Sequence, residues 1–319
     1  MTQYLIRRFL LSLLTIFGVT IVIFVAMRVL PGDPLAMIYG EGQGIYVLSE
    51  EEVAAARASL GLDQPLHVQY LDWMADVARG DLGYSFWVDT PISDTILRRG
   101  PITAQIAVLA ITLAWLIGIP TGIISAMWRE TWLDYILRFF VTLFMAIPSF
   151  WLGLAMILFT VLVLNWRPSI TITQLWENPR ENMLMVIGPS VAMGIGIGAM
   201  IARMTRTTVL ETLREDYVRT ARAKGLADWT LLMRHVLKNA MLPVITLSGL
   251  SFAGLLGGAV AVDRAFGFPG LGAALAQGAV DRDWMMVQNL TLLFAVTFVF
   301  INLLIDILYA WIDPRIRYS

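Results

Sequence analysis

Long uncharged apolar runs recur along this chain and set its organisation. A window of about 19 residues, the length needed to cross ~30 Å of hydrocarbon, identifies the runs that could span a bilayer. The first is free of charge from Phe9 to Met27 and is expected to stop at the turn-forming residues 31–34. The predicted spans cover residues 9–27, 104–126, 135–164, 183–201, 241–262 and 290–310. Because backbone groups in lipid must be satisfied within their own segment, we expect an all-α polytopic membrane protein with about six transmembrane helices.

The composition agrees with lipid as the solvent for much of the chain. Hydrophobic residues make up 58% and charged residues 15%, with a mean hydropathy of +0.71, which lies outside the usual range of soluble domains. The sequence contains no cysteine, which excludes disulfides, thiolate nucleophiles and cysteine-bound metal clusters.

The distribution of charge predicts how the chain is oriented, because Lys and Arg accumulate on the cytoplasmic side. Eight basic and four acidic residues lie between Arg203 and Lys238, whereas residues 31–103 hold four basic and eleven acidic ones. Six spans with a cytoplasmic N-terminus place residues 31–103 outside and the basic segment inside. The tail with Arg315 and Arg317 is then cytoplasmic as well.

The acidic outer segment is predicted to be helical. A capping box at residues 49–52 precedes an alanine-rich helix that would end at Gly61. A second helix should begin near Pro65 and stop at Gly80, and a third should open at residues 90–91 and close at Gly100. The second helix would present one apolar face, formed by Leu66, Tyr70, Met74 and Val77. This segment is either a solvated spacer or a surface that contacts substrate or a docked partner.

The residues required for several chemistries are missing. Lys224 follows Ala223 and Lys238 follows Leu237, so neither lies in the Gly-Lys-Ser/Thr context of a P-loop. His67 and His235 fall on opposite sides of the membrane and form no His-x-x-x-His pair. We therefore expect no catalytic, cofactor-binding or metal-binding residues, and energy must come from a partner or a gradient.

A few polar and small residues inside the spans have two interpretations. Asp306 either reaches the interface to pair with a basic residue such as Arg315 or has a functional role in the membrane. Asp263 and Arg264 at the outer end of the fifth span form either a local ion pair or a substrate contact. Glycines at residues 194, 196, 198, 254, 257 and 258 favour close helix packing over a gate.

The basic segment has the pattern of two short helices around a turn. One helix should run to about Lys224, a turn should fall at Gly225, and a second helix should start at an Asp228 cap. Its apolar stripe of Leu231, Leu232, Val236 and Leu237 suits a protein groove better than lipid headgroups alone. This pattern is typical of a docking element.

Sequence blocks along nearly the whole chain resemble one family, and they occur in its order. RTARAKGL followed by RHVLKNAMLPVIT resembles the cytoplasmic coupling loop of ABC importer permeases of the oligopeptide and dipeptide branch. The blocks YLIRRFLLSLLTIFGVTIVIFVAMRVLPGDP, LGLDQPLHVQYLDWMADVARGDLGYSF and IPSFWLGL are similar to the N-terminus, outer segment and third span of that branch. FGFPGLGAALAQGAVDRDWMMVQ and LLIDILYAWIDPRIRY resemble its last outer loop and C-terminus.

The resemblance implies the transmembrane fold of type I ABC importers and a loop seated in a groove of an ATPase subunit. The implied loop contacts are Arg219, Thr220, Ala221, Gly225, His235 and Leu237. Two departures from the general importer pattern occur, because Arg219-Thr220-Ala221 replaces Glu-Ala-Ala and Lys238 replaces a common proline. Both departures match the peptide branch.

The resemblance further implies a non-catalytic inner-membrane subunit that forms half of a peptide pathway. Its expected partners are a second homologous permease, two ATPase subunits that hydrolyse ATP, an extracytoplasmic substrate-binding protein and membrane lipid, with no nucleic acid and no cofactor. The expected parts are an N-terminal helix (1–30), a periplasmic segment (31–103), the importer domain (104–310, with its coupling loop at 211–240) and a cytoplasmic tail (311–319). Nickel, glutathione or oligosaccharide cargo, and a gradient-driven secondary transporter, remain as alternatives, whereas no set of residues supports an intramembrane enzyme.

Overall fold

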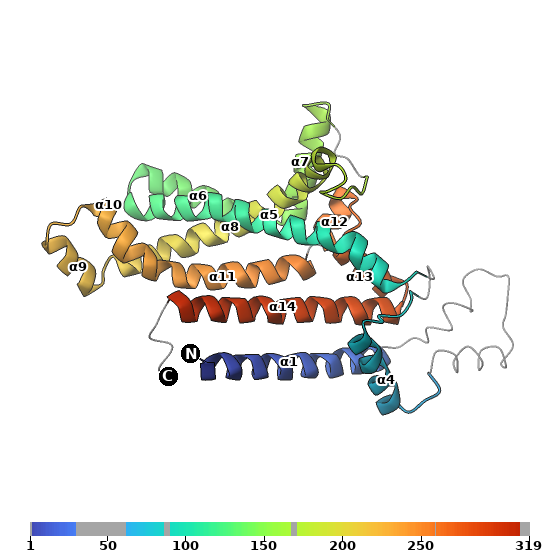
Figure 1. The fold of residues 1–319 in the computed structure, drawn as a ribbon. Helices are drawn as coiled ribbons and strands as arrows, with labels where there is room; N and C mark the ends of the chain where they lie inside the picture. The colour runs from blue at the N-terminus through green and yellow to red at the C-terminus, as the bar shows by residue number, and fades with distance from the viewer. Residues whose placement is uncertain (1, 30–61, 86–89, 167–170, 259, 313–319) are drawn as a thin grey trace. The chain divides into compact units, whose positions relative to one another are not determined.

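The structure is a computed structural model that describes residues 2–29, 62–85, 90–166, 171–258 and 260–312. Regular structure in these ranges is helical, and an isolated bridge between Tyr84 and Pro91 is the extended pairing found there (Figure 1). The described chain divides into two compact units, one formed by residues 102–269 and 301 onward, the other by residues 2–101 and 270–300. The helices α5 (Ile92–Met127) and α14 (Trp284–Ile312) each contribute residues to both units.

The first unit is built around α8 (Pro179–Thr212), which lies among the other helices of that unit (Figure 1). It packs against α6 (Trp132–Ala146), α7 (Ser149–Leu162) and α11 (Leu237–Gly258). Asn178 caps the start of α8 by accepting a hydrogen bond from the Glu181 amide at 3.3 Å. The short helix α12 (Val260–Phe266) follows α11 and contacts α7 and α8.

Small residues allow α5 and α8 to approach closely. A Cβ atom on Gly118 would lie 2.5 Å from the Gly198 carbonyl oxygen, and one on Gly122 would lie 2.5 Å from that of Ala202. From the opposite side, Gly194 and Gly198 lie against the backbone of α5 at Ala110 and Ala114. The two helices therefore pack backbone to backbone, as small residues spaced by four permit in membranes.

The second unit joins α1 (Thr2–Val29), α4 (Leu66–Arg79), α13 (Leu271–Val280) and the first part of α14. Trp73 of α4 is buried against Phe24 of α1, with ring centroids 6.2 Å apart, and against Leu292 of α14. Its indole nitrogen donates a hydrogen bond to Asn289 Oδ1 at 3.2 Å. This aromatic contact fixes α4 across α1 and α14, because a buried indole needs a partner for its N–H.

The predicted spans are largely confirmed. Five described helices are long and apolar enough to cross a membrane, and six spans result if α6 and α7 are counted as one. The prediction of a single third helix over 135–164 was wrong, because α6 and α7 meet at 100°. The cause is local: Pro148 forces Ile147 into an extended conformation with ψ 123°, which ends α6.

One predicted boundary also differs. The outer helix expected to close at Gly100 instead continues through Pro101 as α5, because Ile102 and Ile106 beyond it are buried and hold the helix in place. Helix α8 includes Arg203 and Arg206 and ends at Thr212, within one residue of the predicted start of the loop at 211.

The predicted second outer helix is confirmed as α4, with Gly80 ending it at φ 83°. Of its predicted apolar face, Leu66 is exposed while the other three residues pack inward. The helix expected after the capping box at 49–52, the turn at 31–34 and the tail with Arg315 and Arg317 lie outside the described residues, as does the partner expected for Asp306.

Candidate functional site

The basic segment folds as two short helices around a tight turn. Helix α9 (Asp216–Ala223) is followed by a turn at Gly225, whose φ is +81°, and then by α10 (Asp228–Leu231). The Gly225 amide donates to the Arg222 carbonyl at 3.0 Å and the Leu226 amide to the Ala221 carbonyl at 3.4 Å. These two bonds form a Schellman motif, which needs a left-handed residue and therefore favours glycine. The predicted turn at Gly225 is confirmed, whereas the cap of α10 is Ala227 and not Asp228.

The helix that begins with α10 continues beyond the predicted apolar stripe. After α10 the chain widens into a π-helix (Leu232–Val236) and enters α11 without a break. Single π-turns inside longer helices often mark functional positions. A rigid helical connection therefore links this segment to the fifth span.

One face of the segment is buried inside the first unit. Val218 and Ala221 of α9 pack with Leu231, Leu232 and Val236 in a single cluster. The same cluster includes Ala126 at the end of α5, Val209 near the end of α8 and Ala240 in α11. The segment is thus held by apolar burial against the ends of three long helices.

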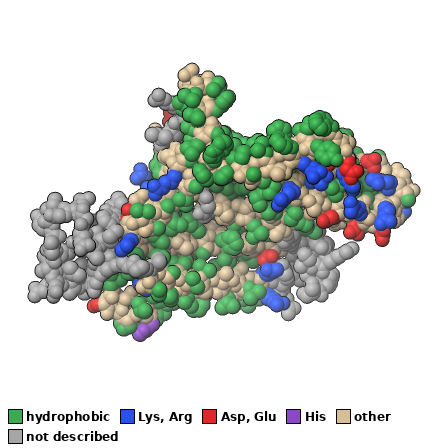
Figure 2. Space-filling view, turned by 180° about the vertical axis from the view of Figure 1, so that it is seen from behind, with side chains coloured by type: hydrophobic (Ala, Val, Ile, Leu, Met, Phe, Trp, Pro, Cys, Tyr) green, Lys and Arg blue, Asp and Glu red, His purple; other side chains and the backbone are tan. Residues whose placement is uncertain are grey.

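The opposite face is exposed and charged. Arg219 pairs with Asp216 at 3.2 Å, and Arg222 pairs with Asp228 across the turn at 3.4 Å. Both pairs are largely exposed, so each is worth at most about 1 kcal/mol. Figure 2 shows Lys, Arg, Asp and Glu gathered over this end of the unit, apart from the hydrophobic surface of the long helices. Such a charged end belongs in water or against a polar partner.

The predicted contact residues separate into two groups. Arg219, Thr220 and Gly225 lie on the exposed face. Ala221 is 8% exposed in the apolar cluster, and Leu237 packs against that cluster. His235 is half-buried, and its backbone carbonyl accepts a hydrogen bond from the Tyr217 hydroxyl at 3.3 Å. The structure therefore brings the first three together on one surface and places Ala221 and Leu237 beneath it.

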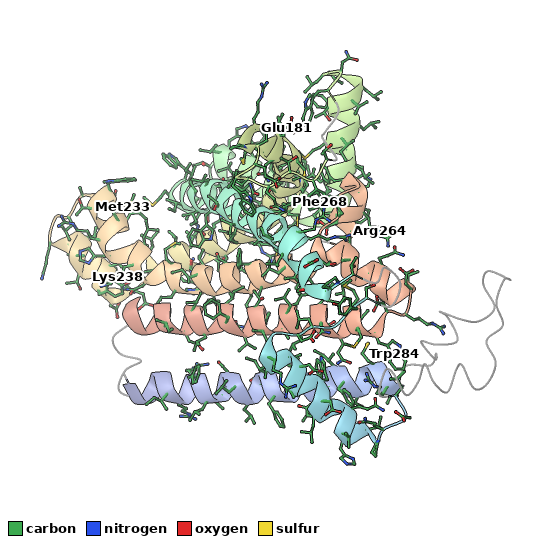
Figure 3. The ribbon with its side chains drawn as sticks, turned by 45° about the vertical axis from the view of Figure 1, so that its right-hand side comes forward. Glu181, Met233, Lys238, Arg264, Phe268 and Trp284 are labelled. Atoms are coloured by element: carbon green, nitrogen blue, oxygen red, sulfur yellow. The ribbon has the colours of Figure 1, made fainter. Side chains whose placement is uncertain are left out.

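Two large apolar residues on the exposed face were missed from the sequence. Trp229 is 66% exposed and Met233 is 42% exposed, four positions apart on one side of the helical turn. Figure 3 labels Met233 and Lys238, both at this end of the unit. Their spacing, offset from the stripe of Leu231, Leu232 and Val236, is the signal that could have revealed them.

A buried ion pair near the segment was also missed. Arg206 of α8 donates from Nε and Nη2 to the two carboxylate oxygens of Asp134 on α6, at 3.0 and 2.9 Å. The Ser125 hydroxyl of α5 donates to the same carboxylate at 2.5 Å, and Asp134 is 0% exposed. This network joins three helices just above the apolar cluster, and only their packing brings its members together.

The packing predicted for the glycines inside the spans is confirmed for two of them and wrong for two others, and the ion pair predicted at the outer end of the fifth span is not tested. Gly194 and Gly198 pack against α5 as expected, but Cβ atoms on Gly196 and Gly254 would meet nothing within 4 Å. Asp263 is 2% exposed and lies next to Arg264 in α12. The ion pair expected between these two residues stays a prediction.

Comparison with known proteins gives this arrangement its context. Residues 118–318 match the family described as binding-protein-dependent transport system inner membrane component, and residues 1–107 match the N-terminal component of the same systems. This chain belongs to that family. The permease is thus a multi-pass inner-membrane subunit of an ABC importer, and its role is that of a transport component.

Full-length relatives and solved structures agree with this assignment. The permease is 38% identical over 320 residues to a protein of Brucella abortus provisionally named a peptide transport system permease, with 100% of both chains covered. It is 36% identical over 319 residues to the glutathione transport system permease protein GsiC of Escherichia coli, again with 100% of both covered. An inward-facing structure of the MetNI methionine ABC transporter has a TM-score of 0.56 at 19% identity, covering 69% of this chain and 96% of that one. An amino acid ABC transporter solved with histidines has a TM-score of 0.53 at 14% identity, covering 74% and 96%. These two likenesses show the fold.

Proposed function

We propose that this permease forms half of a peptide-import pathway and that the segment from α9 to the π-helix is its contact with a partner ATPase. The observation behind this proposal is the two-faced segment itself. Its exposed face presents Arg219, Thr220, Trp229 and Met233, while its buried face packs against the ends of α5, α8 and α11. A displacement at the exposed face would pass directly to three spans, provided that the partner binds two states of the permease differently.

The remaining parts of the proposal follow from family membership and charge. A second homologous permease completes the pathway, two ATPase subunits hydrolyse ATP, and an extracytoplasmic binding protein delivers the cargo. The relatives named for peptide and for glutathione transport both favour a peptide-like cargo. The excess of Lys and Arg in the basic segment favours a cytoplasmic location for that segment and for both termini.

Replacing Gly225 with valine tests the contact. A β-branched residue at φ +81° raises the free energy of this backbone conformation by more than about 1–2 kcal/mol. The turn should therefore change shape, and the residues of the exposed face should move relative to one another. We expect the free energy of binding to the ATPase subunits to weaken by about 1.4 kcal/mol or more. Uptake of a labelled dipeptide by the assembled importer should then fall at least about tenfold, and the ATPase subunits should no longer co-purify. Membrane insertion should be unchanged.

Gly80→Val is the matched control. Gly80 has φ 83°, and a Cβ there meets nothing within 4 Å, as at Gly225, but it ends α4 in the other unit. This variant should retain the ATPase subunits. Retention of both uptake and ATPase subunits by Gly225→Val would contradict the proposed contact.

Competition of dipeptide uptake by glutathione would distinguish a broad peptide cargo from a narrow one.

A further inference from the structure

A polar cavity of about 270 Å³ opens between α5, α6 and α8, entirely within the first unit. The three helices each contribute to its lining: Thr121, Gly122, Ser125, Arg138, Val141, Thr142, Ala202, Arg203, Arg206 and Thr207. One of the lining residues, Gly122, lies against the α8 backbone. It is distinct from the exposed face of the basic segment, and none of its lining residues belongs to the proposed ATPase contact.

The cavity has an excess of positive charge. Arg206 is paired with Asp134, but neither Arg138 nor Arg203 has a carboxylate partner in the described part of the chain. Arg138 instead lies 5.8 Å from the centroid of the Tyr135 ring. Two guanidinium groups at one cavity attract an anion, because Arg binds phosphate and carboxylate through paired N–H donors.

The cavity is also preorganised. Asp134 and Ser125 hold Arg206 through its Nε and Nη2 atoms, so its orientation is fixed while Nη1 donates no hydrogen bond to a described residue. The hydroxyl of Thr142, another lining residue, makes no hydrogen bond to a described residue either. Together with Arg138 and Arg203, these groups line one cavity and supply several hydrogen-bond donors there.

The position of the cavity along the helices matches the depth of lipid headgroups. The predicted span of α8 ends at residue 201, so the last 11 residues of this helix extend about 16 Å past the hydrocarbon on the inner side. Arg206 and Arg203 lie six and nine residues before the end of α8, or about 9 and 14 Å from it. Arg138 lies six residues after the start of α6, at a similar depth.

We propose that this cavity binds the phosphate of an acidic phospholipid. Its volume is below the range of about 300–1,000 Å³ typical of clefts that enclose a drug-sized ligand, so it suits a headgroup and not an enclosed peptide. Basic pockets between membrane-spanning helices at headgroup depth are suited to anionic lipids. The lipid would bridge α6 and α8 beside the buried ion pair and would stabilise the packing of the two helices.

Native mass spectrometry of the full-length permease tests this site. The delipidated protein in an uncharged detergent is titrated with phosphatidylglycerol and, separately, with phosphatidylcholine of the same acyl chains. We expect the wild type to bind phosphatidylglycerol more tightly than phosphatidylcholine. The double variant Arg138→Gln with Arg203→Gln should bind phosphatidylglycerol at least about tenfold more weakly than the wild type does. Phosphatidylcholine binding should be the same in both proteins.

Arg214→Gln with Arg234→Gln is the matched control, because it removes the same charge from exposed positions of the basic segment. It should leave phosphatidylglycerol binding unchanged. An equal loss in this control, or no loss in the cavity variant, would overturn the site. Displacement of the lipid by inorganic phosphate or by free dialanine would overturn the lipid assignment in favour of a soluble anion. If the double variant fails to fold, Arg138→Gln alone applies the same test, since that side chain is exposed and makes no hydrogen bond to a described residue.

Discussion

Single residues act here through burial and backbone geometry as much as through charge. Asp134 and Arg206 form an ion pair with two hydrogen bonds between them, and 0% and 22% of their side chains are exposed. Arg129 and Glu130 also form an ion pair, but their side chains are 44% and 68% exposed. The two pairs have the same chemistry and very different environments, so their contributions to stability should differ.

We expect Arg206→Ala to destabilise the permease by about 3–5 kcal/mol, because it leaves the buried Asp134 carboxylate without its cation. Arg129→Ala should change stability by no more than about 1 kcal/mol. Thermal unfolding of the two variants in the same detergent provides the measurement. Equal melting temperatures for the two variants would show that the buried pair is not the stronger contact.

At the scale of elements, helix α5 and helix α8 are held together by glycine contacts and by the hydrogen bond that Arg206 donates to Ser125. Gly118 and Gly122 are spaced by four and face α8, where any Cβ would meet backbone atoms. Gly196 is two positions from the packing glycines Gly194 and Gly198, yet a Cβ atom there would face open space. The same residue type in neighbouring helices therefore has opposite roles.

Gly122→Ala should lower stability and reduce the yield of assembled protein, because the new methyl group would lie 2.5 Å from the Ala202 carbonyl oxygen and 2.6 Å from the Thr205 Cβ atom. Gly196→Ala should be neutral or stabilise α8 by up to about 1 kcal/mol, since alanine favours helix and no clash occurs. Melting curves of both variants would check this difference. Tolerance of Gly122→Ala without a change in melting temperature would contradict the close packing of α5 and α8.

At the scale of the whole molecule, charge decides which way the chain crosses the membrane. The basic segment and the acidic outer segment belong to different units, and their predicted locations lie on opposite sides of the membrane. The absence of cysteine makes this prediction simple to test, because a single introduced thiol is the only reactive one.

We expect Asp72→Cys to react with a membrane-impermeant maleimide on intact spheroplasts, and Lys224→Cys to react only after permeabilisation. Both side chains are exposed, so access to reagent and not burial should decide labelling. Mass spectrometry of the labelled permease gives the readout. The reverse pattern would place the basic segment outside and would exclude an ATPase contact there.

The sequence by itself determined the spans, the end of α4 at Gly80 and the turn at Gly225. These features depend on local properties: the length of an apolar run, and glycine's access to positive φ. The bend between α6 and α7 was equally local, since Pro148 signals it, but the apolar run through Ile147 concealed it.

Only the tertiary structure decided which side of the basic segment is free and which is buried. Ala221 and Trp229 could not be assigned to a face without the ends of α5, α8 and α11 against which the segment packs. The same holds for Asp134 and Arg206, which are 72 residues apart in sequence. Burial and ion pairing are properties of several segments together, so a pattern read along one segment does not contain them.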